Sequence, residues 1–144
     1  MATGIVTCLE CGRRNRVPPS ADGVPRCGNC GHPLPWITEA GDDDFADRVE
    51  QAGIPVLVDM WADWCVPCRQ VSPALEQLAR DRAGTLKLVK VDVDRSPKTA
   101  ERFSVRAVPT LMLVRQGRVL SRRAGAAPVA ALRGWVDEEL GSRP

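Results

Sequence analysis

The chain has 144 residues, of which 44% are hydrophobic and 26% are charged, and this size allows one ordinary core and a small appendage. Its net charge of +2 at pH 7 is too small to indicate binding to nucleic acid or to an anionic membrane. No apolar run approaches the roughly 18 residues of a membrane span, and residues 1–8 lack the basic and apolar regions of a signal peptide. We therefore expect a cytoplasmic protein whose cysteines are reduced, metal-bound or catalytic.

Residues 1–33 contain four of the six cysteines: Cys8, Cys11, Cys27 and Cys30. Their spacing, C-x₂-C-x₁₅-C-x₂-C, is typical of a zinc ribbon with four thiolate ligands. The segment has no strand or helix pattern long enough to build a core, so we expect bound zinc to supply the missing folding free energy. His32, which follows Cys30, is expected on the surface and not as a ligand.

From about residue 34 the pattern changes to alternating strands and helices. Residues 34–39 are predicted to form a short strand, and three aspartates at 42–44 are expected to cap a short helix that follows them. Residues 54–61 indicate a buried strand. Residues 66–82 indicate an amphipathic helix, which Pro73 should kink.

The second half continues the alternation. Residues 86–93 are predicted to form a second buried strand, and residues 96–103 a short helix with proline in its first turn. Residues 110–114 and 118–123 indicate two strands joined in a hairpin, and a last helix is expected from Pro128. The order predicts an α/β fold with a mixed sheet and helices on both faces.

Cys65 and Cys68 lie between a β-branched apolar strand and the start of a helix. At a helix N-terminus, free backbone N–H groups and the helix dipole stabilise a thiolate. Because a second thiol follows one helical turn later, we expect a centre for dithiol–disulfide exchange.

From about residue 34 to residue 140 the chain resembles thioredoxin. The resemblance rests on Val58-Asp59 before Trp61-Ala62, Trp64-Cys65-x-Pro67-Cys68, Pro73, Val108-Pro109-Thr110, Gly117 and Gly125. It implies the thioredoxin fold for residues 34–144, preceded by a zinc-ribbon domain over residues 1–33. This combination is similar to the zinc-containing bacterial thioredoxins, often called the thioredoxin-2 type.

The resemblance also implies roles for residues of the dithiol site. Cys65 should be the exposed nucleophile, and Cys68 should be buried and resolve the mixed disulfide. Asp59, an acid in an otherwise apolar strand, should accept the proton of Cys68, because desolvation raises the pKa of a buried carboxyl toward neutrality. Lys90 matches the lysine that partners this aspartate.

Pro109 matches the cis-proline of the family, which faces the dithiol and exposes the backbone of Val108 to an extended substrate. Trp64 should line the contact surface, and Trp61 should pack beneath the site. Gly125 should leave room for the substrate backbone.

The activity implied is that of a protein-disulfide reductase in cell redox homeostasis, regenerated by a thioredoxin reductase with NADPH. Zinc is expected as a structural ion in the ribbon, and no organic cofactor is expected in the chain itself. The family suggests ribonucleotide reductase, methionine sulfoxide reductase and peroxiredoxins as targets. No nucleic-acid or membrane partner is expected. Arg13, Arg14 and Arg16 have no aromatic residues between them, which favours a solvated surface over a nucleic-acid site.

Two alternatives come from different features. The zinc ribbon permits a zinc-linked redox sensor or chaperone-like module, because zinc thiolates can be oxidised and release the metal. Val66 stands where the family usually has glycine, and the residues between the cysteines tune the reduction potential. A disulfide oxidase or isomerase is therefore the other alternative.

Overall fold

A computed structural model describes residues 4–21 and 23–141 of the chain. In chain order its elements are β1 (Ile5–Thr7), β2 (Arg14–Arg16), β3 (Trp36–Glu39), η1 (Ala46–Glu50), β4 (Val56–Trp61), α1 (Val66–Asp81), β5 (Lys87–Asp92), α2 (Pro97–Arg102), β6 (Thr110–Arg115), β7 (Arg118–Ala124) and α3 (Val129–Leu140). No helix within these described residues is long and apolar enough to cross a membrane.

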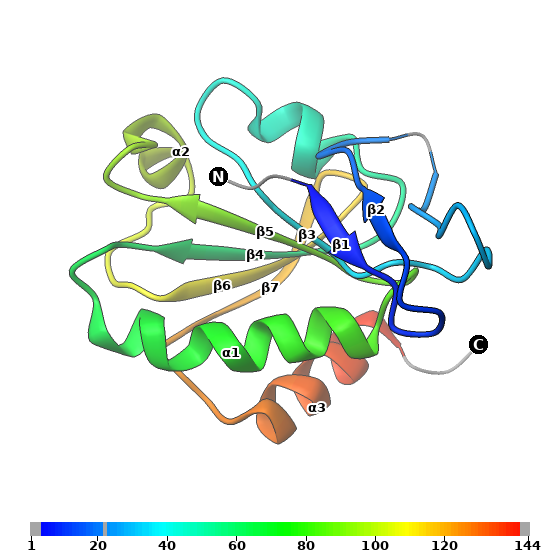
Figure 1. The fold of residues 1–144 in the computed structure, drawn as a ribbon. Coiled ribbons are helices and arrows are strands. Elements are labelled where there is room, and N and C mark those ends of the chain that lie inside the picture. The colour runs from blue at the N-terminus through cyan, green and yellow to red at the C-terminus, as the bar shows by residue number, and fades with distance from the viewer. Residues whose placement is uncertain (1–3, 22, 142–144) are drawn as a thin grey trace.

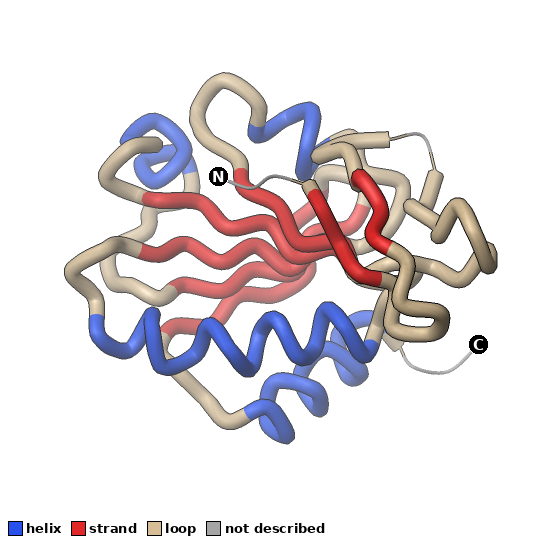
Figure 2. The backbone as a smooth tube through the Cα atoms, in the orientation of Figure 1, coloured by secondary structure: helices blue, strands red, loops and turns tan. Residues whose placement is uncertain are grey.

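A five-stranded sheet in the order β3-β5-β4-β6-β7 forms the centre of the molecule (Figure 1). The strands β3, β5 and β4 run parallel, whereas β6 and β7 are antiparallel to their neighbours. Helices α1 and α3 lie on one side of this sheet and η1 and α2 on the other (Figure 2). The predicted mixed sheet with helices on both faces is therefore confirmed.

The side chains of β4 alternate between two cores. Leu57 packs with residues of α1 and α3, and Val58 packs on the opposite face with residues of η1. Because successive side chains of a strand point to opposite faces, Asp59 shares the face of Leu57 and lies beneath α1. This alternation positions the only acid of the strand under the helix that begins at the dithiol.

The aspartates at 42–44 do not cap the helix that follows them, contrary to the sequence prediction. That helix is a single π-type turn, η1, without a side-chain cap. Asp42 instead accepts hydrogen bonds from the backbone N–H and hydroxyl of Thr99, each at 2.8 Å. It thus caps α2, whose own N-cap residue, Ser96, makes no capping hydrogen bond.

The four-cysteine segment packs against β3 at one edge of the sheet. Val17 lies in one buried cluster with Leu34 and Trp36, and the indole N–H of Trp36 donates to the carbonyl of Pro18 at 2.8 Å. Lys87 of β5 is fully buried at the same place. Residues before position 33 therefore pack against residues after it, and these contacts join the four-cysteine segment to the sheet.

Sequence reasoning did not identify Lys87 as a buried residue. Its ammonium donates to the carbonyls of Pro19 at 2.6 Å and Arg48 at 2.7 Å and lies 4.2 Å from the centre of the Trp36 ring. Burial lowers the pKa of Lys87 to about 8. A buried charge needs such partners, and here they come from two segments far apart in the sequence.

Candidate functional site

Cys65 and Cys68 form a disulfide at the N-terminus of α1, with their Cα atoms 5.3 Å apart. Cys65 is the N-cap residue, and its sulfur accepts the backbone N–H of Cys68 at 3.1 Å. This sulfur therefore occupies the position where free helix N–H groups favour negative charge. The helix start comes where the sequence pattern predicted it.

Cys65 is less accessible to solvent than the sequence suggested. In the disulfide form each cysteine is only 3% exposed. Ala62 packs in the same cluster, with Trp61 and Val108 against it. The expectation of an exposed Cys65 is therefore not met in the oxidised state, because the loop before β6 covers the sulfur.

The covering loop contains the cis peptide bond Val108–Pro109. The carbonyl oxygen of Val108 lies 3.5 Å from the sulfur of Cys65. The loop is fixed at its far side, where the backbone N–H of Gly125 donates to the carbonyl of Pro109 at 2.9 Å. This backbone segment thus borders the sulfur of Cys65.

Two apolar side chains stand exposed beside the disulfide. Trp64 is 67% exposed and Val66 is 55% exposed, although most large apolar side chains in the described chain are buried. The indole N–H of Trp64 donates to the carboxylate of Asp94 at 2.9 Å, which fixes the ring. Exposed apolar groups beside a reactive centre are suited to contact with a partner protein.

Asp59 is 2% exposed, and its Oδ1 has no hydrogen-bond partner. Burial raises its pKa to about 6, although the positive charge of Lys90 acts in the opposite direction. A carboxyl with a pKa near neutrality can both accept and release a proton under physiological conditions.

Lys90 of β5 lies beside Asp59 of β4 in the sheet, but its side chain makes its hydrogen bonds to other residues. Its ammonium donates to the hydroxyl of Ser72 and to a carboxylate oxygen of Glu76, each at 2.7 Å. Both acceptors belong to α1. Sequence reasoning missed these two residues, although Cys68, Ser72 and Glu76 follow one another at intervals of four residues, which places them on one helix face.

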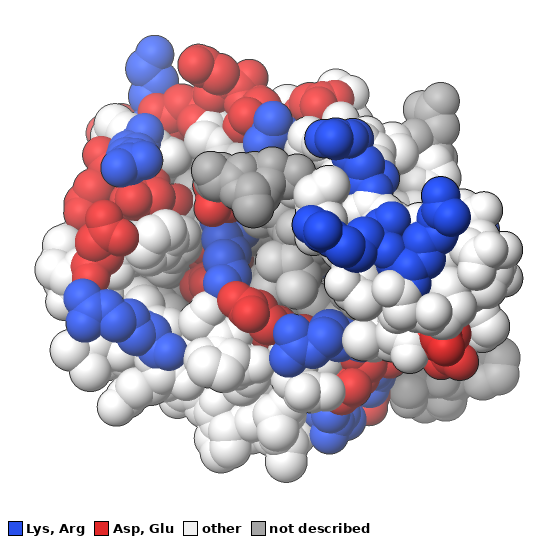
Figure 3. Space-filling model, viewed as in Figure 1, with Lys and Arg blue, Asp and Glu red and all other residues white. Residues whose placement is uncertain are grey.

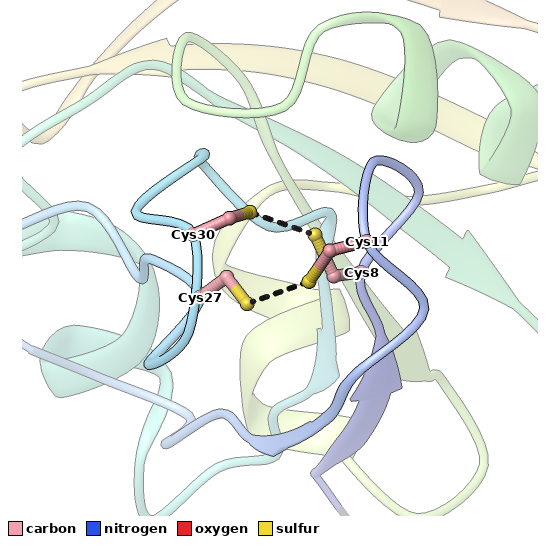
Figure 4. Close-up of side chains that lie close together, drawn as sticks. All are labelled: Cys8, Cys11, Cys27 and Cys30. Atoms are coloured by element: carbon pink, nitrogen blue, oxygen red, sulfur yellow. Dashed lines mark hydrogen bonds between the residues drawn. The ribbon is translucent and has the colours of Figure 1, made fainter.

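The four N-terminal cysteines converge as their spacing predicted, from two loops that face each other (Figure 4). Their sulfurs all lie within 4.8 Å of one another, and the Cys8–Cys30 and Cys11–Cys27 pairs are both separated by 3.6 Å. A tetrahedral zinc with Zn–S bonds of about 2.3 Å requires sulfurs about 3.8 Å apart. The four residues could therefore hold a metal ion.

The chemistry of this cluster also fits a cation. The backbone N–H of Cys30 lowers the pKa of Cys27 to about 6. The pKa of Cys30 is lowered by the backbone N–H of His32, but partial desolvation of the thiolate and the neighbouring sulfurs raise it overall to about 12. Four thiolates at this separation repel one another, and a divalent metal ion removes that repulsion.

The arginines of β2 and the preceding loop, Arg13, Arg14 and Arg16, are exposed. Figure 3 shows Lys and Arg side chains gathered over this part of the molecule. His32 is also exposed, and its Nδ1 lies 3.6 Å from the sulfur of Cys30.

Comparisons with known proteins agree with this geometry. The thioredoxin family model matches residues 36–138. Thioredoxin C-3 of Corynebacterium nephridii is 34% identical over 140 residues, covering 94% of this chain and 95% of the relative. Thioredoxin C-2 of the same organism is 39% identical over 104 residues, covering 72% of this chain and 96% of the relative. The thioredoxin of Haemophilus influenzae is 38% identical over 104 residues, covering 72% of this chain and 97% of the relative.

Proposed function

The chain belongs to the thioredoxin family and is a protein-disulfide reductase, and we propose that Cys65 and Cys68 divide its reaction between them. Cys65 is the attacking residue and Cys68 the resolving residue. The observation that carries this proposal is the Cys65–Cys68 disulfide at the N-terminus of α1, where only the sulfur of Cys65 accepts a helix N–H group.

In the first step the Cys65 thiolate attacks one sulfur of a target disulfide. A bond forms between Cys65 and that sulfur, and the other target sulfur leaves as a thiolate. In the second step Cys68 loses its proton and attacks the sulfur of Cys65. The Cys65–Cys68 disulfide forms as the bond between Cys65 and the target sulfur breaks, and that sulfur leaves as a thiolate. Both target sulfurs are then reduced, so two electrons have passed to the target.

Asp59 accepts the proton of Cys68 in the second step. The carboxyl lies beneath the helix that carries Cys68, and its pKa of about 6 suits proton acceptance near neutral pH. Its unpartnered Oδ1 supports this role, because a carboxylate oxygen already held by a donor is a weaker base.

The target backbone binds along the loop of Val108 and Pro109. The carbonyl of Val108 borders the sulfur of Cys65 and can pair with an extended strand of the target. Gly125 adjoins this loop with no atom near the position of a side chain, so a backbone can approach closely. Trp64 and Val66, the exposed neighbours of Cys65 in the chain, supply apolar contact.

Residues 1–33 form a zinc-binding ribbon with Cys8, Cys11, Cys27 and Cys30 as ligands, and residues 34–144 form the thioredoxin domain. When bound, the metal supplies positive charge that holds four thiolates together.

The regenerating partner is a thioredoxin reductase that uses NADPH. Ribonucleotide reductase, methionine sulfoxide reductase and peroxiredoxins in the cytoplasm are the proposed targets.

Insulin reduction tests the division of roles. Cys65→Ser should abolish the reduction of insulin disulfides. Cys68→Ser should also stop turnover but should leave a covalent mixed disulfide, visible as an insulin adduct that dithiothreitol removes. Full activity of Cys65→Ser would refute the two-cysteine mechanism, and an adduct formed through Cys68 in the Cys65→Ser protein would reverse the two roles.

A second candidate function is a zinc-linked redox sensor, favoured by the exposure of two ligands, Cys11 and Cys30. Exposed zinc thiolates are accessible to oxidants. Treating the full-length protein with peroxide while a dye follows zinc tests this function. Release of zinc at peroxide levels that leave the activity of the dithiol intact supports it, and retention of zinc until the protein is inactivated argues against it.

A further inference from the structure

We propose that Glu76, with Ser72, is a positioning residue that holds the Lys90 ammonium on α1 and away from the Asp59 carboxylate. The inference rests on the proposed role of Asp59 as acceptor of the Cys68 proton. It adds a residue of α1 to the proton-handling part of the site.

The Lys90 ammonium lies near two acidic residues, Asp59 and Glu76, and is hydrogen-bonded to only one of them. Lys90 and Asp59 are paired in register on neighbouring parallel strands, so their side chains lie on the same face of the sheet. The Lys90 ammonium nevertheless donates to Glu76 at 2.7 Å, and Oδ1 of Asp59 is left without a partner. The cation beside the buried acid is thus bound by a different carboxylate.

Ser72 completes the arrangement on α1. Its hydroxyl accepts from the Lys90 ammonium at 2.7 Å and donates to the Glu76 carboxylate at 3.3 Å. Ser72 and Glu76 are four residues apart and therefore neighbours on one helix face. The same face carries Cys68 four residues earlier, so the resolving cysteine and the lysine-binding pair form one row along the helix.

The groups that face Asp59 act on its proton in opposite directions. Burial and the Glu76 charge raise its pKa, and the Lys90 charge lowers it. The neighbour on β6 is the uncharged Leu111. Beyond it on β7, the guanidinium of Arg123 lies 5.5 Å from the Trp135 ring centre.

Because Glu76 neutralises the Lys90 charge, Asp59 keeps a proton affinity suited to pH near 7. If Lys90 paired with Asp59, the carboxylate would be stabilised as an anion and would be a weaker base. Glu76 is suited to this task because Lys90 and Ser72 hold its own pKa below the usual range, against the effect of burial. It therefore stays negative while Asp59 titrates.

The test is an NMR titration of the Asp59 carboxyl carbon in the full-length oxidised protein. In Glu76→Gln the midpoint should fall by about one pH unit, within the usual effect of a nearby opposite charge. Ser72→Ala should lower it less, because one of two acceptors remains. Glu138→Gln on α3 changes the net charge equally at an exposed position and should leave the midpoint unchanged.

The variant Lys90→Met separates positioning from simple charge. Alone, it should raise the Asp59 midpoint. If Glu76 positions Lys90, Glu76→Gln should lower the midpoint much less in the Lys90→Met background than in the wild type. Equal effects in the two backgrounds would overturn the positioning role, as would an unchanged or higher midpoint in Glu76→Gln.

A kinetic measurement distinguishes this inference from the proposed function. The rate of mixed-disulfide resolution by Cys68 can be followed against pH in single-turnover experiments with wild type and Glu76→Gln. A profile that moves to lower pH together with the Asp59 midpoint supports both. A midpoint that falls while the kinetic profile stays unchanged supports the positioning role of Glu76 and overturns the proton-accepting role of Asp59.

Discussion

Replacing Asp59 by asparagine should stabilise the oxidised protein at neutral pH. Asp59 is 2% exposed, and burial raises its pKa from 3.8 to about 6. Between these two values the folded protein holds a proton that the unfolded chain has lost, so the wild type loses stability as the pH rises through this window. A shift of about two pH units at about 1.36 kcal/mol per unit corresponds to about 3 kcal/mol.

The free energy of unfolding can be measured by urea denaturation of oxidised wild type and Asp59→Asn at several pH values. The difference in the free energy of unfolding between Asp59→Asn and wild type should increase by about 3 kcal/mol from pH 3.5 to about pH 7, in favour of Asp59→Asn, and stay constant above that pH. Contributions from other acids cancel, because both proteins contain them. A stability difference that stays constant from pH 3.5 to 8 would refute the assignment of a raised pKa to Asp59.

The same substitution should reduce function while it increases stability. Asparagine cannot accept the proton of Cys68, so resolution of the mixed disulfide should slow at pH 7. The initial attack by Cys65 should be much less affected. Stopped-flow measurement of the two steps checks this separation, and equal slowing of both steps would contradict it.

Three further predictions concern other parts of the chain. Lys87→Met keeps the apolar stem but removes a charged donor from two carbonyls, and should lower the free energy of unfolding in urea by about 2 kcal/mol. The purified protein should contain about one zinc per chain, and Cys27→Ser should lower both the zinc content measured by mass spectrometry and the Tm. Asp42→Ala should leave the start of α2 uncapped, seen as faster hydrogen exchange of the Thr99 amide.

Val66 is the residue most relevant to the direction of the reaction. It stands exposed beside Cys65, and stiff apolar bulk at this position can change the stability of the thiolate and the potential. A reduction potential near about −270 mV for Cys65–Cys68 supports the reductase, and a value above about −200 mV supports the oxidase or isomerase alternative. Comparison with Val66→Gly measures how much of the potential depends on this side chain.

Features set by spacing within one segment could be predicted from the sequence. Cys65 and Cys68 are three residues apart at the start of a helix, so one turn of helix brings them together wherever that helix packs. The two pairs of N-terminal cysteines likewise lie on short turns, closed by the backbone hydrogen bonds from Gly12 to Cys8 and from Gly31 to Cys27. From residue 34 onward the strand and helix order followed from hydrophobic periodicity, because each element must bury one face against the sheet, whereas the short strands β1 and β2 were not predicted.

Which side chains meet across elements was decided only by the tertiary structure. Lys90 was predicted as the partner of Asp59, and the two residues are neighbours in register, but the position of α1 over β5 gives the lysine ammonium a different partner in Glu76. Asp42 caps a helix that begins far along the chain. The energies of alternative ion pairs and caps differ by only a few kcal/mol, so they depend on the packing of distant segments and not on local sequence pattern.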